Sequence, residues 1–153
     1  MIQCIVSVFL SILLKFLAHP NFIFTDGLGF LAWIYYVPVL FSISKFTIKQ
    51  SLISGFVYGF FSYGFTFYWL LKYDILAGLG AYLLFGIYWL VIFVLLKISS
   101  KTRKYSFIFN CALIFLAEVF FSAGYFGFTY GVSGYTQWKY SLFVRSARYL
   151  KVW

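Results

Sequence analysis

Hydrophobic residues in this chain form five long runs, and short polar connectors separate them. The runs cover approximately residues 2–18, 28–44, 51–71, 75–96 and 106–123. Each is close to the roughly 20 residues that an α-helix needs to cross a bilayer. The pattern predicts an all-α membrane protein, with residues 1–123 forming a bundle of about five transmembrane helices.

Residues 124–153 form a second region with a different pattern. It begins as an aromatic and glycine-rich segment. Beyond it, at the period of a helix, Ser141, Arg145 and Arg148 share one face. The other face carries Leu142, Phe143, Ser146, Tyr149, Leu150 and Trp153. An apolar face opposite a basic one suits the surface of a membrane. We therefore expect an outer-face segment that continues into a C-terminal amphipathic segment.

Composition supports a membrane protein. Hydrophobic residues make up 64% of the chain and charged residues 10%, and the mean hydropathy is +0.95. Soluble domains carry about 25% charged residues. The net charge of +9 arises from twelve Lys and Arg against three acids. Because most of the basic residues lie between apolar runs, they indicate topology and contact with anionic lipid, and we expect no nucleic-acid partner.

The basic residues also predict the orientation of the bundle. The connectors 45–50 and 97–105 lie on one side and hold six Lys and Arg, whereas the connectors 19–27 and 72–74 hold only Lys72. The side richer in basic residues faces the cytoplasm. The N-terminus is then cytoplasmic, and residues after 123 lie on the outer side.

Two features predict how the helices pack. Ser51, Gly55 and Gly59 recur every four residues, so they line one helix face and let a neighbouring helix approach closely. Pro38 lacks a backbone donor, and we expect it to kink the second run.

The sequence offers few groups for catalysis. His19 is the one histidine and falls in a predicted outer loop, where we expect it to be solvated. Asp26 and Asp74 have the same setting and are expected to be solvated turn formers. Cys4 and Cys111 lie in apolar runs, where a thiolate is disfavoured. We assign no catalytic residue and expect neither a cofactor nor a metal site.

Glu118 is different, because it lies inside the fifth apolar run. A charged acid at the centre of a membrane helix costs roughly 2.5–3.5 kcal/mol on insertion scales. Such residues are functional by default, although a structural hydrogen bond to a neighbouring helix explains them equally well. No basic residue lies within a helical turn of Glu118 in the sequence, which favours the neutral acid. Gln137 and Tyr135 are the partners that the spacing suggests.

The stretch from Glu118 to Gln137 resembles a segment of the apolipoprotein N-acyltransferase family. The family pattern is Glu-Trp-x-Arg-Gly, four residues, Gly-Phe-Pro-Trp, three residues and Gly-Tyr-Ser-Gln. The matching residues, without a gap, are Glu118, Gly127, Phe128, Gly134, Tyr135 and Gln137. "AHPNF" (18–22), "LAWIYYVPVL" (31–40) and "SGFVYGFFSYGFTFYWL" (54–70), which includes Tyr68 and Trp69, resemble further family segments in the same order. We expect these residues to have a structural or lipid-contact role.

The chain departs from the family pattern in sequence and in length. Val119, Phe121, Ser122, Thr129 and Tyr130 replace the family's Trp, Arg, Gly, Pro and Trp. The family continues into more membrane helices and a nitrilase-like domain. That domain's Glu-Lys-Cys triad takes an acyl chain from phospholipid and passes it to a lipoprotein. The sequence ends at Trp153.

The resemblance implies the membrane part of an apolipoprotein N-acyltransferase in the bacterial inner membrane. On this interpretation the chain is a truncated gene product or one half of a split enzyme, and it is inactive alone. Its partners would be phospholipid and, through a separate catalytic chain, lipoprotein. The alternative is a small membrane protein without enzymatic activity, such as a lipid-binding or assembly subunit.

Overall fold

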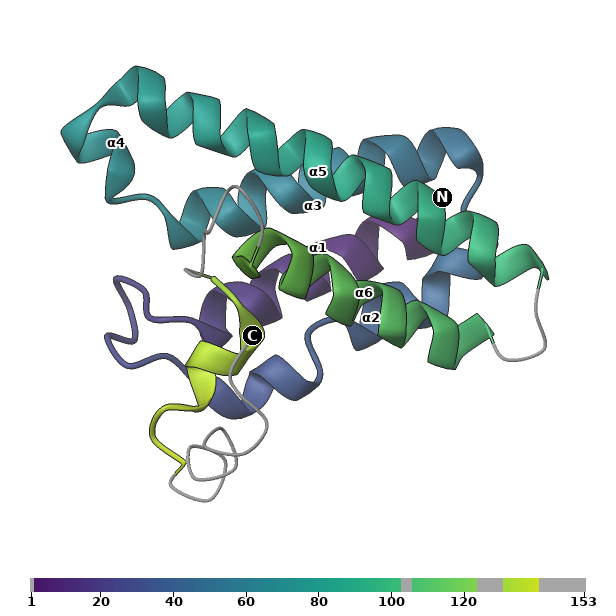
Figure 1. Cartoon of the computed structure of the whole chain (residues 1–153), viewed down its shortest axis with the longest axis horizontal. Helices are drawn as coiled ribbons and strands as arrows, with labels where there is room; N and C mark the ends of the chain where they lie inside the picture. The colour runs from purple at the N-terminus through teal and green to yellow at the C-terminus, as the bar shows by residue number, and fades with distance from the viewer. Residues whose placement is uncertain (1, 103–105, 124–130, 141–153) are drawn as a thin grey trace.

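The computed structural model describes residues 2–102, 106–123 and 131–140, and these contain helices but no strand. The helices are α1 (Ile2–Ala18), η1 (Gly29–Trp33), α2 (Val37–Ser42), η2 (Ile43–Lys45), α3 (Ile48–Thr66), α4 (Leu70–Tyr73), α5 (Ile75–Thr102), α6 (Ser106–Ala123) and η3 (Ser133–Gln137). They form a bundle in which α3 and α5 run side by side along most of their length (Figure 1). Helix α1 packs against α3 and α2, and α6 packs mainly against α5. The predicted C-terminal amphipathic segment, 141–153, falls outside the described residues.

Two of the described helices are long and apolar enough to cross a membrane. They are α5, over Ile75–Lys101 with a mean hydropathy of 2.4, and α6, over Ser106–Ala123 with a mean hydropathy of 1.9. The helix α1 is equally apolar in character but has 17 residues. The all-helical fold predicted from the sequence is therefore confirmed, while five membrane passes remain a prediction.

The second apolar run, predicted as one helix over 28–44, is broken. It forms η1, then a turn, and then α2 followed directly by η2. Pro38 occupies the first turn of α2, where its missing N–H costs nothing because the first amides of a helix have no partner within it. The proline therefore starts a new helix rather than kinking a continuous one.

Local sequence signals explain where two of the helices begin. The Thr47 hydroxyl accepts a hydrogen bond from the Gln50 amide, and the Gln50 side chain accepts one from the Thr47 amide, so that a capping box starts α3. The Asp74 carboxylate accepts from the Ala77 amide and caps α5. Asp74 is thus a helix cap. Helix α5 continues to Thr102, so Lys97 and Lys101 lie on a helix rather than in a connector.

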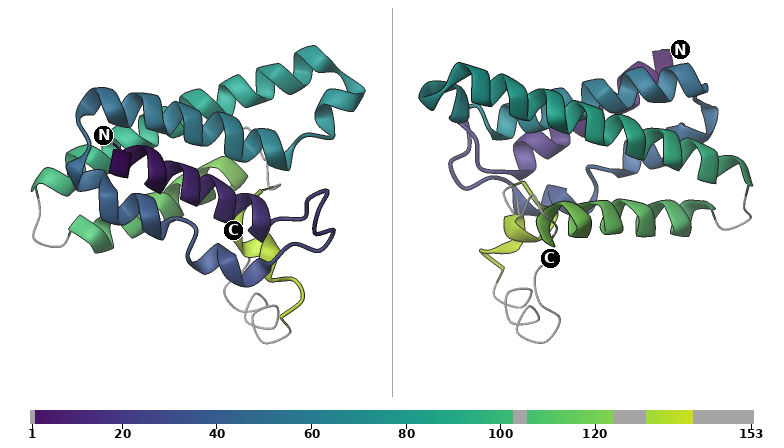
Figure 2. Two further views of the ribbon diagram at one scale, coloured as in Figure 1. Left: turned by 180° about the vertical axis from the view of Figure 1, so that it is seen from behind. Right: turned by 45° about the horizontal axis from the view of Figure 1, so that its top comes forward.

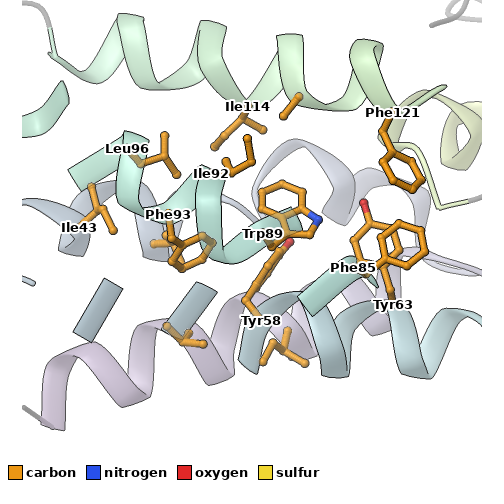
Figure 3. Close-up of a cluster of buried hydrophobic side chains, with 14 of the residues drawn as sticks. Ile43, Tyr58, Tyr63, Phe85, Trp89, Ile92, Phe93, Leu96, Ile114 and Phe121 are labelled. Carbon is orange, nitrogen blue, oxygen red and sulfur yellow. The ribbon is translucent and has the colours of Figure 1, made fainter. Parts of the chain in front are cut away.

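The core is aromatic and centres on Trp89 of α5, which is 1% exposed (Figure 3). The Tyr58 ring meets Trp89 edge to face, with 5.0 Å between centroids, and the Tyr63 and Phe85 rings stack at 3.9 Å. Aromatic contacts of this kind add about 0.5–1.5 kcal/mol each to the burial of their area. Phe121 of α6 packs on Phe85 and so joins this core to the end of the bundle where Glu118 lies.

Candidate functional site

The carboxylate of Glu118 is the centre of a polar cluster near the end of α6. Oε1 accepts hydrogen bonds from the Ser133 hydroxyl (2.6 Å) and the Tyr36 hydroxyl (2.9 Å), and Oε2 accepts one from the Ser133 amide (3.2 Å). The Tyr35 hydroxyl lies 3.2 Å from Oε1 and 2.5 Å from the Ser133 hydroxyl, so the two hydroxyl protons of Tyr35 and Ser133 are shared among three contacts. We call Glu118, Tyr35, Tyr36 and Ser133 the Glu118 cluster. It connects α6, the turn before α2 and the start of η3.

The helix η3 is held to η1 by a second group of contacts. The Gln137 side chain donates to the Gly29 carbonyl (2.7 Å), and its oxygen accepts from the Trp33 indole (3.2 Å). A Cβ atom on Gly29 would lie 2.1 Å from the Thr136 carbonyl oxygen, so the approach of η1 to η3 requires glycine there. Both views in Figure 2 show η3 against η1 at this end of the bundle. The motif segment therefore folds back across the bundle.

Lys15 of α1 lies near the Glu118 cluster and is fully buried. Its ammonium nitrogen lies 3.7 Å from the centroid of the Tyr63 ring and between 5.6 and 5.8 Å from the rings of Trp89, Tyr35 and Tyr58. The nitrogen has no hydrogen-bond partner among the described residues. Aromatic ring faces attract a cation, and the opposite charge of Glu118 is close enough to act on Lys15. We call the four rings the Lys15 cage.

Sequence reasoning missed Lys15, although a signal for it was present. Lys15 is the one charged residue in the first apolar run. The rule that singles out Glu118, an ionisable residue within an apolar run, applies to it equally. The two residues lie 103 positions apart in the sequence, so their proximity could not be read from spacing.

His19, predicted to be solvated, is buried with 4% of its surface exposed. Its Nδ1 lies 3.1 Å from the Lys15 carbonyl oxygen, immediately after the end of α1. Burial lowers the pKa of His19 to about 4, and the charge of Lys15 lowers it further. Interactions with the backbone of Lys15, Gly131 and Val132 raise the pKa but do not outweigh these two effects. The ring is therefore neutral at neutral pH, and it lies buried between the end of α1 and the backbone of Gly131 and Val132.

The structure places the predicted site residues in different positions. Gln137 bonds to η1 rather than to Glu118, Gly134 is half-buried beside Ser133, and Tyr135 is exposed. The suggestion that Gln137 and Tyr135 are the partners of Glu118 is wrong, because Ser133 occupies that place. Tyr68 and Trp69 are more than one-third exposed at the turn between α3 and α4. Gly127 and Phe128 fall outside the described residues.

Between the helices α1 and α3 lies an apolar groove with a volume of about 470 Å³. It is lined by Ile5, Val8, Phe9, Ile12, Ile53, Ser54, Val57, Phe61 and Phe65. We call it the α1–α3 groove. Its lining offers almost no polar group, so it is suited to hydrocarbon and unsuited to water.

The site is built to hold segments together. The Glu118 carboxylate accepts its four hydrogen bonds from Tyr35, Tyr36 and Ser133, which lie on other segments of the chain. Neither cysteine lies beside it. The Cys4 sulfur lies 4.0 Å from the Gln50 side chain, at the opposite end of the bundle, and Cys111 is exposed on α6. Within the described ranges, no three His, Cys, Asp or Glu side chains gather as metal ligands would.

Comparisons with known proteins agree with the fold and the motif. A helical bundle with two helices of membrane-spanning length and hydropathy is typical of a helical membrane protein. The family described as apolipoprotein N-acyltransferase N-terminal domain matches residues 10–153, and the chain belongs to this family. Apolipoprotein N-acyltransferase 1 of Treponema denticola (strain ATCC 35405) is 31% identical over 138 residues. That match covers 90% of this chain and 25% of the relative, so the chain spans about a quarter of the relative's length. No solved structure matches.

Proposed function

We propose that these residues act as the membrane part of an apolipoprotein N-acyltransferase in the bacterial inner membrane. The chain crosses the membrane five times, with its N-terminus in the cytoplasm and the residues after 123 on the outer side. Membership of the family supports the assignment. The observation that carries it is the position of Glu118, which clamps the segment before Gly134–Gln137 onto the bundle.

In this proposal the Glu118 cluster has a positioning role. It fixes η3 at the outer face, where a catalytic part outside the membrane rests on the bundle. That part takes an acyl chain from a phospholipid and transfers it to the amino terminus of a lipoprotein. The α1–α3 groove, open on the side of the bundle and lined by apolar side chains, admits the acyl chain between helices. These residues alone do not transfer the acyl group.

Acylation of a synthetic substrate tests the proposal. The purified chain is mixed with phospholipid and a diacylglyceryl lipopeptide, and mass spectrometry follows the gain of one acyl chain. We expect no product from the chain alone. We expect product when the remaining part of the T. denticola relative is added as a separate polypeptide. Turnover by the chain alone that Cys4→Ala or Cys111→Ala abolishes would overturn the proposal.

A pair of serine variants tests the role of the Glu118 cluster in that assay. Ser133→Ala removes a hydroxyl that donates to Glu118, and the added catalytic part should then act more slowly. Ser51→Ala is the matched control, because the Ser51 hydroxyl donates to the Thr47 carbonyl at the start of α3, away from the Glu118 cluster. If the catalytic part neither binds the chain nor depends on it, the chain is a small membrane protein without a role in acyl transfer.

A further inference from the structure

A polar pocket lies at the end of the bundle opposite to the Glu118 cluster. It has a volume of about 350 Å³ and is formed where η2, the end of α5 and the start of α6 meet. Its polar lining is Ser44, Ser100, Ser106 and Asn110. Helix α6 begins at this pocket with Ser106 and carries Glu118 three turns further on, so the pocket is separate from the proposed acyl-transfer side.

Asn110 in this pocket has a side-chain oxygen that lacks a hydrogen-bond donor among the described residues. Its side chain is 2% exposed, and its oxygen Oδ1 has no hydrogen-bond partner in the described part of the chain. A buried polar atom without a partner destabilises the folded state. A ligand with a hydroxyl or amine group would remove that cost.

The surroundings of the pocket are positively charged. The Lys97 ammonium donates to the Ser44 carbonyl at 2.6 Å, and Lys45 and Lys101 are the chain neighbours of Ser44 and Ser100. The three acids of the sequence, Asp26, Asp74 and Glu118, all lie elsewhere. The N-terminus of α6, an 18-residue helix, adds backbone N–H groups and the positive end of its dipole. This end of the bundle therefore favours an anion.

An apolar shelf lies next to these polar groups. The Phe41 ring of α2 and the Phe107 ring of α6 lie 5.6 Å apart, and both side chains also line the pocket. Phe41 is 69% exposed and Phe107 47% exposed, so both rings face the surroundings of the bundle. Polar groups inside and exposed rings outside match a molecule with a polar head and hydrocarbon chains.

We propose that this pocket binds the head group of an anionic phospholipid whose head carries hydroxyl groups, such as phosphatidylglycerol. The phosphate lies by Lys97, Lys101 and the start of α6, and a head-group hydroxyl donates to Asn110. The acyl chains run over the Phe41–Phe107 shelf. Basic pockets between membrane helices bind anionic head groups in this way. The inference requires a membrane setting but does not depend on acyl transfer.

Native mass spectrometry of the full chain in detergent tests the pocket, because it counts bound lipids. Phosphatidylglycerol and phosphatidylcholine with the same acyl chains are titrated in parallel. We expect phosphatidylglycerol to bind about tenfold more tightly, which is a difference of about 1.4 kcal/mol. Phosphatidylethanolamine, which is zwitterionic, should resemble phosphatidylcholine. Equal affinity for all three lipids would overturn the proposal.

Three variants separate a built site from diffuse attraction. Asn110→Leu keeps the side-chain size and removes the unsatisfied oxygen. It should therefore leave the melting temperature unchanged or higher, while the preference for phosphatidylglycerol falls at least about threefold. Lys101→Gln, at an exposed position, should lower the preference similarly, and Lys72→Gln at the other end should not. An Asn110→Leu variant with the full preference, or equal effects of the two lysine variants, would contradict the site.

The source of the phosphate is tested with a soluble head group. Glycerol 3-phosphate carries the phosphate and the hydroxyls but no acyl chains, and it therefore cannot use the apolar shelf. We expect it not to displace phosphatidylglycerol at millimolar concentration. If it displaces the lipid completely, the ligand is a soluble phosphate ester rather than a lipid.

Discussion

At the residue scale, Glu118 and Lys15 bring two opposite charges into an apolar bundle. Lys15 is fully buried and Glu118 is half-buried, and each has a specific environment. The carboxylate receives hydrogen bonds from Tyr36 and Ser133, whereas the ammonium lies among aromatic rings. Tyr35 belongs to both groups, because its hydroxyl faces Glu118 and its ring faces Lys15. The two charged residues are therefore expected to depend on each other.

Loss of the Glu118 carboxylate alone should destabilise the protein more than loss of Glu118 and Lys15 together. Glu118→Leu frees the donors of Ser133 and Tyr36 and removes the opposite charge that acts on Lys15, at a cost of about 1–3 kcal/mol for each donor left without a partner. Glu118→Gln keeps one acceptor oxygen and should cost less, about 1–2 kcal/mol. Unfolding in mixed detergent, followed by tryptophan fluorescence, measures both.

The double variant Lys15→Met with Glu118→Leu supplies the control for coupling. Met fills the Lys15 cage without a charge, so the double variant should be more stable than Glu118→Leu alone. A double-mutant cycle then gives an interaction energy of about 1–3 kcal/mol. Strictly additive effects would show that the two residues do not interact.

The sequence allowed part of this site to be predicted. Glu118 was identified because an acid in an apolar run is costly whatever surrounds it. Its partners were not, because Tyr35 and Tyr36 lie more than 80 positions away in the sequence and Ser133 is at a position that the family pattern leaves unspecified. The prediction that His19 is solvated was wrong because residues distant in the sequence bury it. A histidine directly after a helix is expected to be solvated, but the distant backbone of Gly131 and Val132 lies against its ring.

At the element scale, the pairing of α3 with α5 follows from small residues. A Cβ atom on Gly59 would lie 2.2 Å from the Phe85 carbonyl oxygen, and one on Gly55 would lie 2.6 Å from the Trp89 carbonyl oxygen. Ser51, the first member of the predicted stripe, is fully buried. The stripe therefore packs against a helix, as its four-residue spacing predicted. The broken second run was less predictable, because apolar periodicity does not report turns.

Two glycine substitutions should have opposite effects on stability. Gly59→Ala places a methyl group against the backbone of α5, which must move, and should cost about 1–3 kcal/mol. Gly80→Ala is the matched control in α5, where a Cβ atom meets nothing within 4 Å. It should stabilise the helix by up to about 1 kcal/mol, because alanine favours a helix. The melting temperature in detergent distinguishes them, and equal losses would contradict close packing at Gly59.

At the scale of the whole molecule, the bundle has two chemically different ends. One end carries the Glu118 cluster, η3 and the exposed ion pair between Lys139 and Asp26, which adds little stability because both side chains are about half exposed. The other end carries the polar pocket with Lys45, Lys97 and Lys101. These three lysines belong to the set of basic residues from which the orientation was predicted, and the orientation itself stays a prediction.

Cysteine labelling should reveal which end faces the cytoplasm. With Cys4 and Cys111 replaced by Ser, single cysteines are placed at Thr25 and Ser44, two exposed positions whose replacement leaves every charge in place. In intact spheroplasts, an impermeant thiol reagent should label Thr25→Cys and leave Ser44→Cys unlabelled, because the end rich in lysine stays in the cytoplasm. After permeabilisation both cysteines should react, which shows that Ser44→Cys is accessible. Labelling of Ser44→Cys in intact spheroplasts would reverse the orientation and contradict the proposed position of the Glu118 cluster at the outer face.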